Sequence, residues 1–387
     1  MIYFDNAATT GVSPEVLDKM LPFFKERFGN PSSQFYEAGR SAKEALENAR
    51  EIIAGCLNCD INEVFFTASG SEADNWAVKG AAEAGLAKGK NKIITSAIEH
   101  HAVLNTCKYL EKHGYEVVYL PVDENGTVLP QTLKDAVDDK TSIVSIMLAN
   151  NEIGTIEPIA ELAGIAHEAG ALFHTDAVQA AGHIETDFKA LGVDLLSISG
   201  HKFHAPKGVG ALITRKGLRL PNLIHGGGQE KGRRAGTENV PYIVGMAYAL
   251  KFACDNMEEN TKKIKAIRDR LISGIEEKIP YVKLNGHREQ RLPGNVNFSF
   301  KYIEGESLML WLDMNSVAVS SGSACASGSL DPSHVLLAIG LPHEIAHGSL
   351  RLSIGDLNTM EEADKLLEIL PPIVEKLRAM SPLYENK

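Results

Sequence analysis

The chain has 387 residues, 44% of them hydrophobic, with 39 lysines and arginines against 50 aspartates and glutamates and a formal net charge of −11. This acidic balance argues against a binding surface for nucleic acid or for an anionic membrane. The sequence opens without a basic stretch followed by an apolar one, and no run of about 20 apolar residues occurs, so we expect a cytoplasmic protein that does not enter the membrane.

Between residues 64 and 215, short segments rich in β-forming residues alternate with longer segments of helical pattern. Strands separated by helices predict βαβ units and a mostly parallel sheet. One intervening helix, EADNWAVKGAAEAGLAKG, is expected to begin after Ser71, a favourable N-cap residue. We therefore predict a large α/β domain over residues 15–255 with a mostly parallel seven-stranded sheet. The expected strands are EVFFT, KIITS, YEVVYL, TSIVSIML, ALFHTDAV, DLLSISG and GVGALIT.

The pattern changes after about residue 252. A long charged segment, EENTKKIKAIRDRLISGIEEKI, predicts a helix with one apolar face made of Ile264, Ile267, Leu271 and Ile275. Two strand-like segments follow, NVNFSF and SVAVSS, and TMEE opens the last helix as a capping box from Thr359 to Glu362. These elements predict a smaller α+β domain formed by residues 1–14 and 256–387.

Five cysteines, an odd number in a long chain, argue against a secreted disulfide framework. Cys56 and Cys59 have the C-x-x-C spacing of redox and metal sites, but one pair cannot complete a four-ligand zinc site, so we assign them a structural role and predict no metal. Cys325 lies among small polar residues in SSGSACASG, with no bulky neighbour to bury it. It is either a loop thiol without a role or a reactive thiol. Whether Cys56 and Cys59, or Cys325, ever hold a cluster stays open.

Polar residues follow strand after strand of the expected sheet. Ligands bind open parallel sheets at the carboxyl ends of the strands, so these residues are candidates for one site. The first group, Ser69-Gly70-Ser71, precedes a helix whose free N–H groups suit a phosphate, although the same residues could be an ordinary N-cap. The other groups are Glu99, His100 and His101; Asn150 and Asn151; His174, Asp176 and Gln179; and Ser199, His201 and Lys202.

Asp176 and Lys202 are the most informative of these residues. A lysine on a glycine-rich turn can attach pyridoxal phosphate through its amine, and a carboxylate from an earlier strand can keep the pyridine nitrogen protonated. The pair therefore predicts a pyridoxal-phosphate site. The alternatives are a simple salt bridge or two residues that never meet.

At these residues the sequence resembles the cysteine desulfurases of the NifS/IscS-like group, which are class V, fold-type I pyridoxal-phosphate enzymes. The resemblance covers essentially the whole chain. Each motif alone is weak, but the ordered set is specific, and it implies a fold-type I transferase fold and a symmetric homodimer. The shared motifs are YFDNAATT, FGNPSS, EHHAVL, ANNEIGT, HTDAVQAAG, SISGHKFHAPKGVGAL, HGGGQEKGRRAGTENVP, SSGSACAS and LRLSIG.

The resemblance implies a role for each residue of the site. Lys202 would carry the cofactor, Asp176 would pair with its ring nitrogen, and Gln179 would face its phenolic oxygen. His100 would stack on the ring and transfer protons, and Cys325 would accept sulfur. The remaining residues would hold the cofactor phosphate (Gly70, Ser71, Ser199, His201 and, from the neighbouring subunit, Thr237) or the substrate carboxylate (Arg351, and Asn151, which would also touch the cofactor).

The implied reaction converts L-cysteine to L-alanine and leaves the sulfur on Cys325 as a persulfide, for iron–sulfur cluster assembly, with tRNA thiolation as a second use. The phosphate turn reads SGSE where many relatives have a Thr before the Glu, and Ser71 keeps the hydroxyl. The stretch ASGSLDPSHVLLAIG after Cys325 is similar to the group with a longer, mobile catalytic loop, which implies direct handover of sulfur. The acceptor would be an iron–sulfur scaffold protein or a tRNA-thiolation enzyme, and the sequence does not decide between them.

Two other functions remain open. Selenocysteine lyase or aminotransferase activity could use the same cofactor, because the fold determines the cofactor and not the reaction. A sulfur carrier or scaffold that has lost catalysis is a different class of protein, and the presence of Lys202, Asp176 and Arg351 argues against it.

Overall fold

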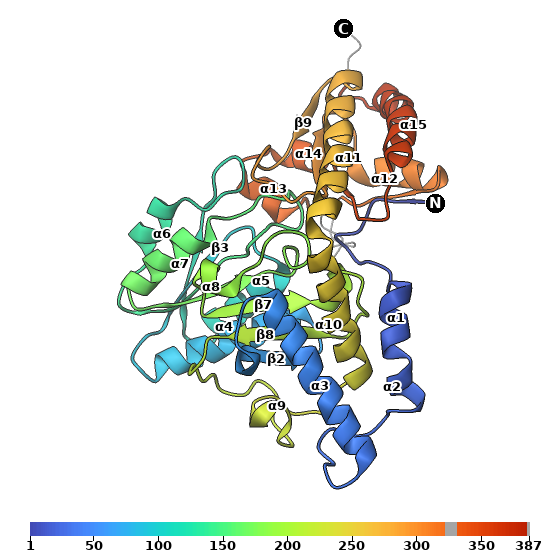
Figure 1. The fold of residues 1–387 in the computed structure, drawn as a ribbon. Coiled ribbons are helices and arrows are strands. Elements are labelled where there is room, and N and C mark those ends of the chain that lie inside the picture. Colours follow the sequence, from blue (N-terminus) through green and yellow to red (C-terminus); the bar gives the residue numbers. More distant parts are fainter. Residues whose placement is uncertain (322–330, 385–387) are drawn as a thin grey trace.

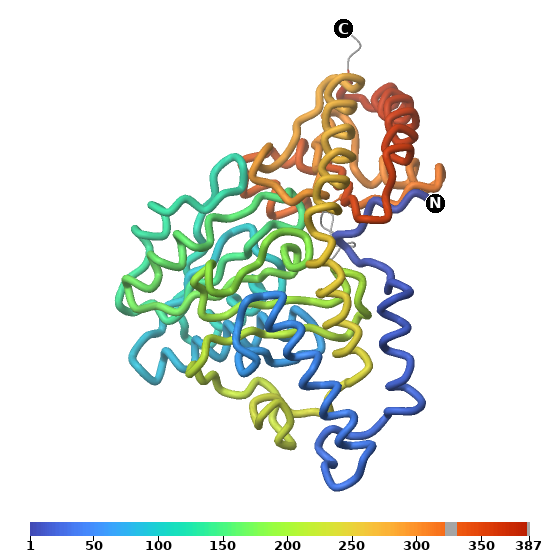
Figure 2. The backbone as a smooth tube through the Cα atoms, in the orientation of Figure 1, coloured from blue at the N-terminus to red at the C-terminus, as the bar shows by residue number. Residues whose placement is uncertain are grey.

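The structure, a computed structural model, describes residues 1–321 and 331–384. Figures 1 and 2 show a larger body and, above it, a smaller body in which the C-terminal elements gather with the N-terminal end of the chain. No described helix is long and apolar enough to cross a lipid bilayer.

The larger body contains a central sheet of seven strands: β2 (Val64–Thr67), β3 (Lys92–Ser96), β4 (Glu116–Leu120), β5 (Thr141–Ser145), β6 (Leu172–Asp176), β7 (Leu195–Ser199) and β8 (Gly210–Thr214). Their order across the sheet is β2-β8-β7-β6-β5-β3-β4. Strand β8 runs antiparallel to both of its neighbours, and the other neighbouring strands pair in parallel. The prediction of a mostly parallel seven-stranded sheet is therefore confirmed.

The helices of the larger body are α1 (Pro14–Met20), α2 (Pro22–Lys25), α3 (Glu37–Cys56), α4 (Gly70–Leu86), α5 (His101–Glu111), α6 (Pro130–Ala136), α7 (Ile159–Glu168), α8 (Phe188–Leu191), α9 (Gln229–Gly232) and α10 (Val240–Asp255), with the short 3-10 helices η1 (Ile61–Glu63) and η2 (Gly200–Lys202). They cover both faces of the sheet. Successive strand residues point to opposite faces, so Phe65 packs with α4 and α5, while Phe66 joins the core formed with α3, α7 and α10. Burial on both faces explains why the strands read as continuous apolar segments.

Helix α4 begins two residues earlier than the sequence led us to expect. Ser69, not Ser71, is the N-cap: its backbone is extended and its hydroxyl accepts a 3.1 Å hydrogen bond from the Glu72 N–H. Both serines have the right chemistry for a cap, and the turn after β2 selects the first. The correction places Gly70 and Ser71 in the first helical turn, where backbone N–H groups lack intrahelical acceptors.

The smaller body contains β1 (Ile2–Tyr3), α11 (Met257–Lys278), β9 (Val282–Leu284), β10 (Asn295–Phe300), α12 (Gly305–Met314), β11 (Val317–Ala318), α13 (His334–Ala338), α14 (His343–Ala346), β12 (Ser349–Ser353) and α15 (Met360–Met380). Strand β10 lies between β12 and β9 and is antiparallel to both. Strand β1 pairs in parallel with β11, and the fully buried Phe4 joins the same core. The opening segment thus packs with the C-terminal region, as predicted.

Local predictions for the smaller body are confirmed. The charged segment forms α11, and its four apolar residues are buried in the core of the smaller body, namely Ile264, Ile267, Leu271 and Ile275. Thr359 and Glu362 form the expected capping box at the start of α15. Asn256 alone separates α10 from α11, and α11 extends into the smaller body (Figure 1). A division of the chain into 15–255 and 1–14 with 256–387 agrees with this break but stays a prediction.

Candidate active site

Lys202 lies at the end of η2, directly after β7. Its Nζ donates hydrogen bonds to the backbone carbonyls of Ala7 (2.7 Å) and Ala8 (2.8 Å). The N-terminal segment therefore reaches the carboxyl end of β7 and holds the lysine amine. Sequence analysis treated this segment only as a motif and missed the contact, because backbone carbonyls carry no side-chain signature.

Asp176 ends the neighbouring strand β6 and is 5% exposed. Its Oδ1 accepts a 2.8 Å hydrogen bond from the Val178 N–H. Burial raises the pKa of Asp176 to about 6, while this hydrogen bond and the positive charge of Lys202 act in the opposite direction. Asp176 and Lys202 thus lie at or just after the ends of neighbouring strands, and the lysine charge acts on the carboxylate, which favours the predicted pair.

His100 caps α5, and its Nδ1 accepts a 3.1 Å hydrogen bond from the Ala102 N–H. Burial, followed by the charge of Lys202, lowers the pKa of His100 to about 4. The ring is therefore neutral at pH 7, and since Nδ1 accepts, the proton is on Nε2. A neutral imidazole can stack on an aromatic ring and can donate a hydrogen bond through Nε2.

The turn between β2 and α4 meets the end of β7. A Cβ atom at Gly70 would lie 2.8 Å from Val178 Cγ2 and 3.1 Å from Ser199 Cβ, so a larger residue at position 70 would push these neighbours apart. His201, two residues after Ser199, contacts the Thr9 hydroxyl at 3.1 Å through Nδ1. Burial lowers the pKa of His201 to about 4, so its ring is neutral. The turn at Gly70 therefore lies beside Ser199, so two of the predicted phosphate-binding residues, from two separate strand ends, are neighbours.

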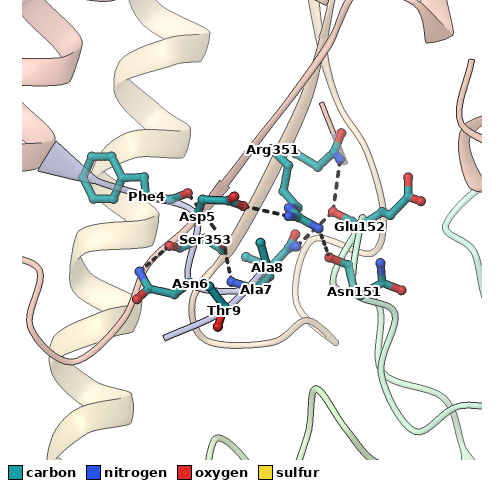
Figure 3. A network of polar contacts seen from close by, with 12 residues as sticks. Phe4, Asp5, Asn6, Ala7, Ala8, Thr9, Asn151, Glu152, Arg351 and Ser353 are labelled. Carbon is teal, nitrogen blue, oxygen red and sulfur yellow. Dashed lines mark hydrogen bonds and ion pairs between the residues drawn. The ribbon is translucent and has the colours of Figure 1, made fainter. Parts of the chain in front are cut away.

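Arg351 lies on β12 and is 2% exposed. Figure 3 shows its guanidinium group between the Asp5 carboxylate, 2.8 Å away, and the backbone carbonyl of Asn151, 3.0 Å away. Gln179 donates a 3.0 Å hydrogen bond to the Ala7 carbonyl. Arg351 and Asn151, predicted to bind substrate, are thus in contact, and Gln179, predicted to face the cofactor, is bound to the N-terminal segment. Asp5 is a partner of Arg351 that sequence analysis missed.

Cys325 lies outside the residues that the structure describes, 1–321 and 331–384. The chain on either side of this gap is attached to the site. Ser320 exchanges backbone hydrogen bonds with Arg351, at 3.2 and 2.6 Å. After the gap, His334 Nε2 donates a 3.0 Å hydrogen bond to the Glu99 carbonyl, and its ring packs against His101 with a centroid distance of 4.9 Å. The segment that carries Cys325 therefore starts and ends beside the candidate site.

Thr237 is exposed, in the segment between α9 and α10. Its role toward a neighbouring subunit stays a prediction. Other polar residues at the strand ends have structural roles. The Asn150 Oδ1 accepts hydrogen bonds within its own turn, and Glu99 and His174 are fully buried and hydrogen-bonded to Ser96 and Ser145, respectively.

A cavity of about 380 Å³ lies between the two bodies. Its lining includes Ala7, Asn151 and Gln179, so it adjoins the candidate site from the side of the N-terminal segment.

Cys56 and Cys59 pack against the main hydrophobic core of the larger body. A hydrogen bond with Cys254, followed by burial, raises the pKa of Cys56, and burial raises that of Cys59 to about 12. Among the described residues, no group of three or more His, Cys, Asp or Glu side chains is placed to hold a metal ion. The pair thus has the environment of structural thiols.

The described residues fit pyridoxal phosphate. Lys202 supplies an amine, Asp176 supplies a buried carboxylate within its electrostatic reach, and the neutral His100 supplies an aromatic face. Gly70, in the first turn of α4, lies so close to Ser199 that no side chain fits at position 70. The backbone N–H groups of this turn can bind an anion.

Comparisons with known proteins agree with this geometry. Residues 2–366 match the family described as Aminotransferase class-V. The chain is 58% identical over 387 residues to "Cysteine desulfurase IscS" of Clostridium botulinum, covering 100% of this chain and 97% of that protein. It is 56% identical over 382 residues to "Cysteine desulfurase IscS" of Methanosarcina thermophila, covering 99% and 94% of the two chains.

A solved structure titled "NIFS-LIKE PROTEIN" superposes with a TM-score of 0.91 at 41% identity, over 97% of this chain and 100% of that one. Another, titled "SspA in complex with cysteine", has a TM-score of 0.81 at 36% identity, over 92% and 99% of the two chains. The chain therefore belongs to the class-V aminotransferase family and, within it, to the pyridoxal-phosphate-dependent cysteine desulfurases.

Proposed function

We propose that this chain converts L-cysteine to L-alanine and that Cys325 receives the sulfur as a persulfide. One observation carries the proposal: the strand of Arg351 is hydrogen-bonded to Ser320, so the carboxylate-binding arginine, Lys202 at the N-terminal segment, and the start of the Cys325 segment share one site. Such an arrangement can hold an amino acid by its carboxylate while a thiol approaches its side chain.

Pyridoxal phosphate, when bound, supplies a pyridinium ring that stabilises negative charge at the substrate Cα. Asp176 would hold the ring nitrogen, and Gln179 would face the phenolic oxygen. Gly70, Ser71, Ser199 and His201 would hold the phosphate, together with Thr237 of a neighbouring subunit.

Lys202 is the proposed base for the Cα proton. The Ala7 and Ala8 carbonyls fix the position of its Nζ, so the amine stays near the carboxyl ends of β6 and β7. His100 is proposed to stack on the cofactor ring and to take part in proton transfer, where the neutral ring must accept a proton before it can donate one. Proton transfer by positioned groups of this kind typically contributes about 10²- to 10⁴-fold to the rate.

Arg351 would bind the substrate carboxylate through its planar guanidinium group. Asp5 and the Asn151 carbonyl would fix the orientation of that group, because each already accepts a hydrogen bond from it. The Cys325 thiolate would then attack the substrate Sγ. An S–S bond forms, the Cβ–Sγ bond breaks, and its electron pair stays with Cβ, which takes a proton and becomes the methyl group of alanine.

Incubation of the protein with L-cysteine and a reductant tests the proposal. Alanine and sulfide are expected in equal amounts, since each turnover yields one alanine and one persulfide sulfur that the reductant releases. Alanine without sulfide would contradict desulfuration. A strong preference for selenocysteine, or amino transfer to a keto acid, would support the alternatives.

The pH dependence of cofactor binding gives a second test. The pKa of Asp176, about 6 in the cofactor-free protein, means that the carboxylate is mostly charged at pH 7 and mostly protonated at pH 5. The affinity for pyridoxal phosphate is therefore expected to fall by about tenfold from pH 7 to pH 5 through this group. Fluorescence titration of apoprotein measures it. Asp176→Asn should bind pyridoxal phosphate more weakly and should lose this fall in affinity between pH 7 and pH 5. A fall of unchanged size in the variant would contradict the assignment.

A homodimer is also proposed. Several large apolar side chains of the N-terminal part are exposed in the single chain: Phe24 (49%), Phe28 (73%), Phe35 (102%) and Tyr36 (54%). Large apolar side chains exposed in one stretch of the chain favour an interface with a second copy. Light scattering at micromolar concentration should give twice the mass of the chain, and Phe35→Asp should shift it toward monomer. A fully active monomer would contradict the proposal.

The sulfur acceptor is proposed to be an iron–sulfur scaffold protein or another sulfur-accepting protein, in the cytoplasm. The described cysteines Cys56, Cys59, Cys107 and Cys254 are free thiols, which agrees with a reducing compartment.

A further inference from the structure

The first turn of α4 contains a negative charge where the proposed phosphate site needs positive potential. Glu72 follows Gly70 and Ser71 directly and takes part in capping the helix: its Oε2 accepts a 2.8 Å hydrogen bond from the Ala68 N–H, while its own N–H donates to Ser69. A carboxylate near a helix N-terminus generally stabilises the helix, because it interacts favourably with the helix dipole. Next to a bound phosphate, however, the same charge repels the ligand.

Arg234 pairs with this carboxylate. Its Nε donates to Glu72 Oε1 at 2.8 Å and its Nη2 donates to Glu72 Oε2 at 3.0 Å, which makes a bidentate ion pair. The two side chains are only 17% and 14% exposed. At this burial, solvent screens the charges less than at an open surface, so the pairing matters more for the local potential.

The segment that carries Arg234 is anchored at a second point. Glu230 forms a buried bidentate pair with Arg50, at 2.9 and 3.0 Å, and accepts a 2.9 Å hydrogen bond from the Phe66 N–H. Arg50 also donates to the Val64 carbonyl at 2.5 Å. Both backbone groups belong to β2, an edge strand of the sheet, so the pair also covers polar groups that an edge would expose.

The backbone around Glu230 has an unfavourable conformation. Glu230 and Lys231 have positive φ values of 48° and 59°, which side-chain-bearing residues adopt at a cost. The Arg50–Glu230 pair holds this strained turn in place. Arg234 therefore reaches Glu72 from a fixed segment and needs little reorganisation to do so.

We propose that Arg234 is a positioning residue for the cofactor phosphate: it neutralises Glu72, so that the first turn of α4 keeps its capping carboxylate and still binds a dianion. The proposal rests on the proposed phosphate site at Gly70 and Ser71. It assigns Arg234 no contact with the phosphate. The residue acts through Glu72, by removing a repulsive charge.

The test is the affinity of apoprotein for pyridoxal phosphate and for pyridoxal, which lacks the phosphate. Arg234→Met is expected to weaken binding of pyridoxal phosphate by about 10- to 100-fold, the order expected for one unpaired carboxylate near a dianion in partly buried surroundings. Added salt should reduce the loss. Binding of pyridoxal should stay within about twofold of the wild-type value.

Glu72→Gln combined with Arg234→Met removes both charges. The double variant is expected to regain an affinity for pyridoxal phosphate within about threefold of the wild type, because no unpaired carboxylate remains. Arg233→Met is the matched control: this neighbouring arginine donates to the Leu218 carbonyl instead and lies over the Phe65 ring. It should bind both ligands normally, and melting curves of each apoprotein check that the variants fold.

Equal losses for pyridoxal and pyridoxal phosphate in Arg234→Met would overturn the proposal, since they would indicate a purely structural effect. So would an unchanged affinity in Arg234→Met, or a double variant that binds no better than the single one. Failure of the proposed function looks different, because then the wild-type apoprotein itself would not discriminate pyridoxal phosphate from pyridoxal.

Discussion

Lys202→Ala is expected to lower cysteine turnover by at least about 1,000-fold and to remove the visible colour of the cofactor-loaded protein. The variant loses both the amine that attaches the cofactor and the proposed base for the Cα proton. Turnover is measured as alanine formed, and the colour by absorbance after incubation with pyridoxal phosphate and removal of the excess.

Lys207→Ala is the matched control, because Lys207 is an exposed lysine five residues further along the same turn. It should keep full activity and colour. Loss of the two hydrogen bonds to Ala7 and Ala8 would destabilise the protein by about 1 kcal/mol each, so Lys202→Arg, which can keep donors there, checks stability separately. Cofactor colour that persists in Lys202→Ala would show that another lysine carries the cofactor.

The fold could be predicted from the sequence because its main signals are local. Apolar segments of strand length alternate with helices. Because ligands bind at the carboxyl ends of parallel strands, this pattern predicts one site that contains Asp176, Lys202 and the turn at Gly70. The structure brings these residues together. A local error occurred where two serines with equal capping chemistry lie two residues apart, and only the path of the backbone decides between Ser69 and Ser71.

What the sequence did not reveal are contacts between distant segments. The Lys202 amine is held by carbonyls 194 and 195 residues away in the chain, and the Arg351 guanidinium pairs with Asp5 across 346 residues. Arg234 reaches Glu72 across 162 residues. No local pattern encodes such pairs, and a backbone carbonyl looks the same in every residue.

Cys325→Ser is expected to bind pyridoxal phosphate as the wild type does and to lose cysteine desulfuration by at least about 1,000-fold. The proposed cofactor contacts use Lys202, Asp176 and the turn at Gly70, none of which includes Cys325. An alcohol near neutral pH is a far poorer nucleophile than a thiolate, so attack on the substrate sulfur should fail after the substrate has bound. The cofactor absorbance should therefore still change when cysteine is added, while sulfide and alanine do not form.

Cys59→Ser serves as the control for this variant, because burial raises the pKa of Cys59 to about 12 and the thiol packs against the core. It should keep its activity. Mass spectrometry of wild-type protein that has been loaded with cysteine and alkylated should place one extra sulfur on the peptide of Cys325. Extra sulfur on the peptides of Cys56, Cys107 or Cys254 instead, together with sulfide release by Cys325→Ser, would show that a different thiol accepts the sulfur.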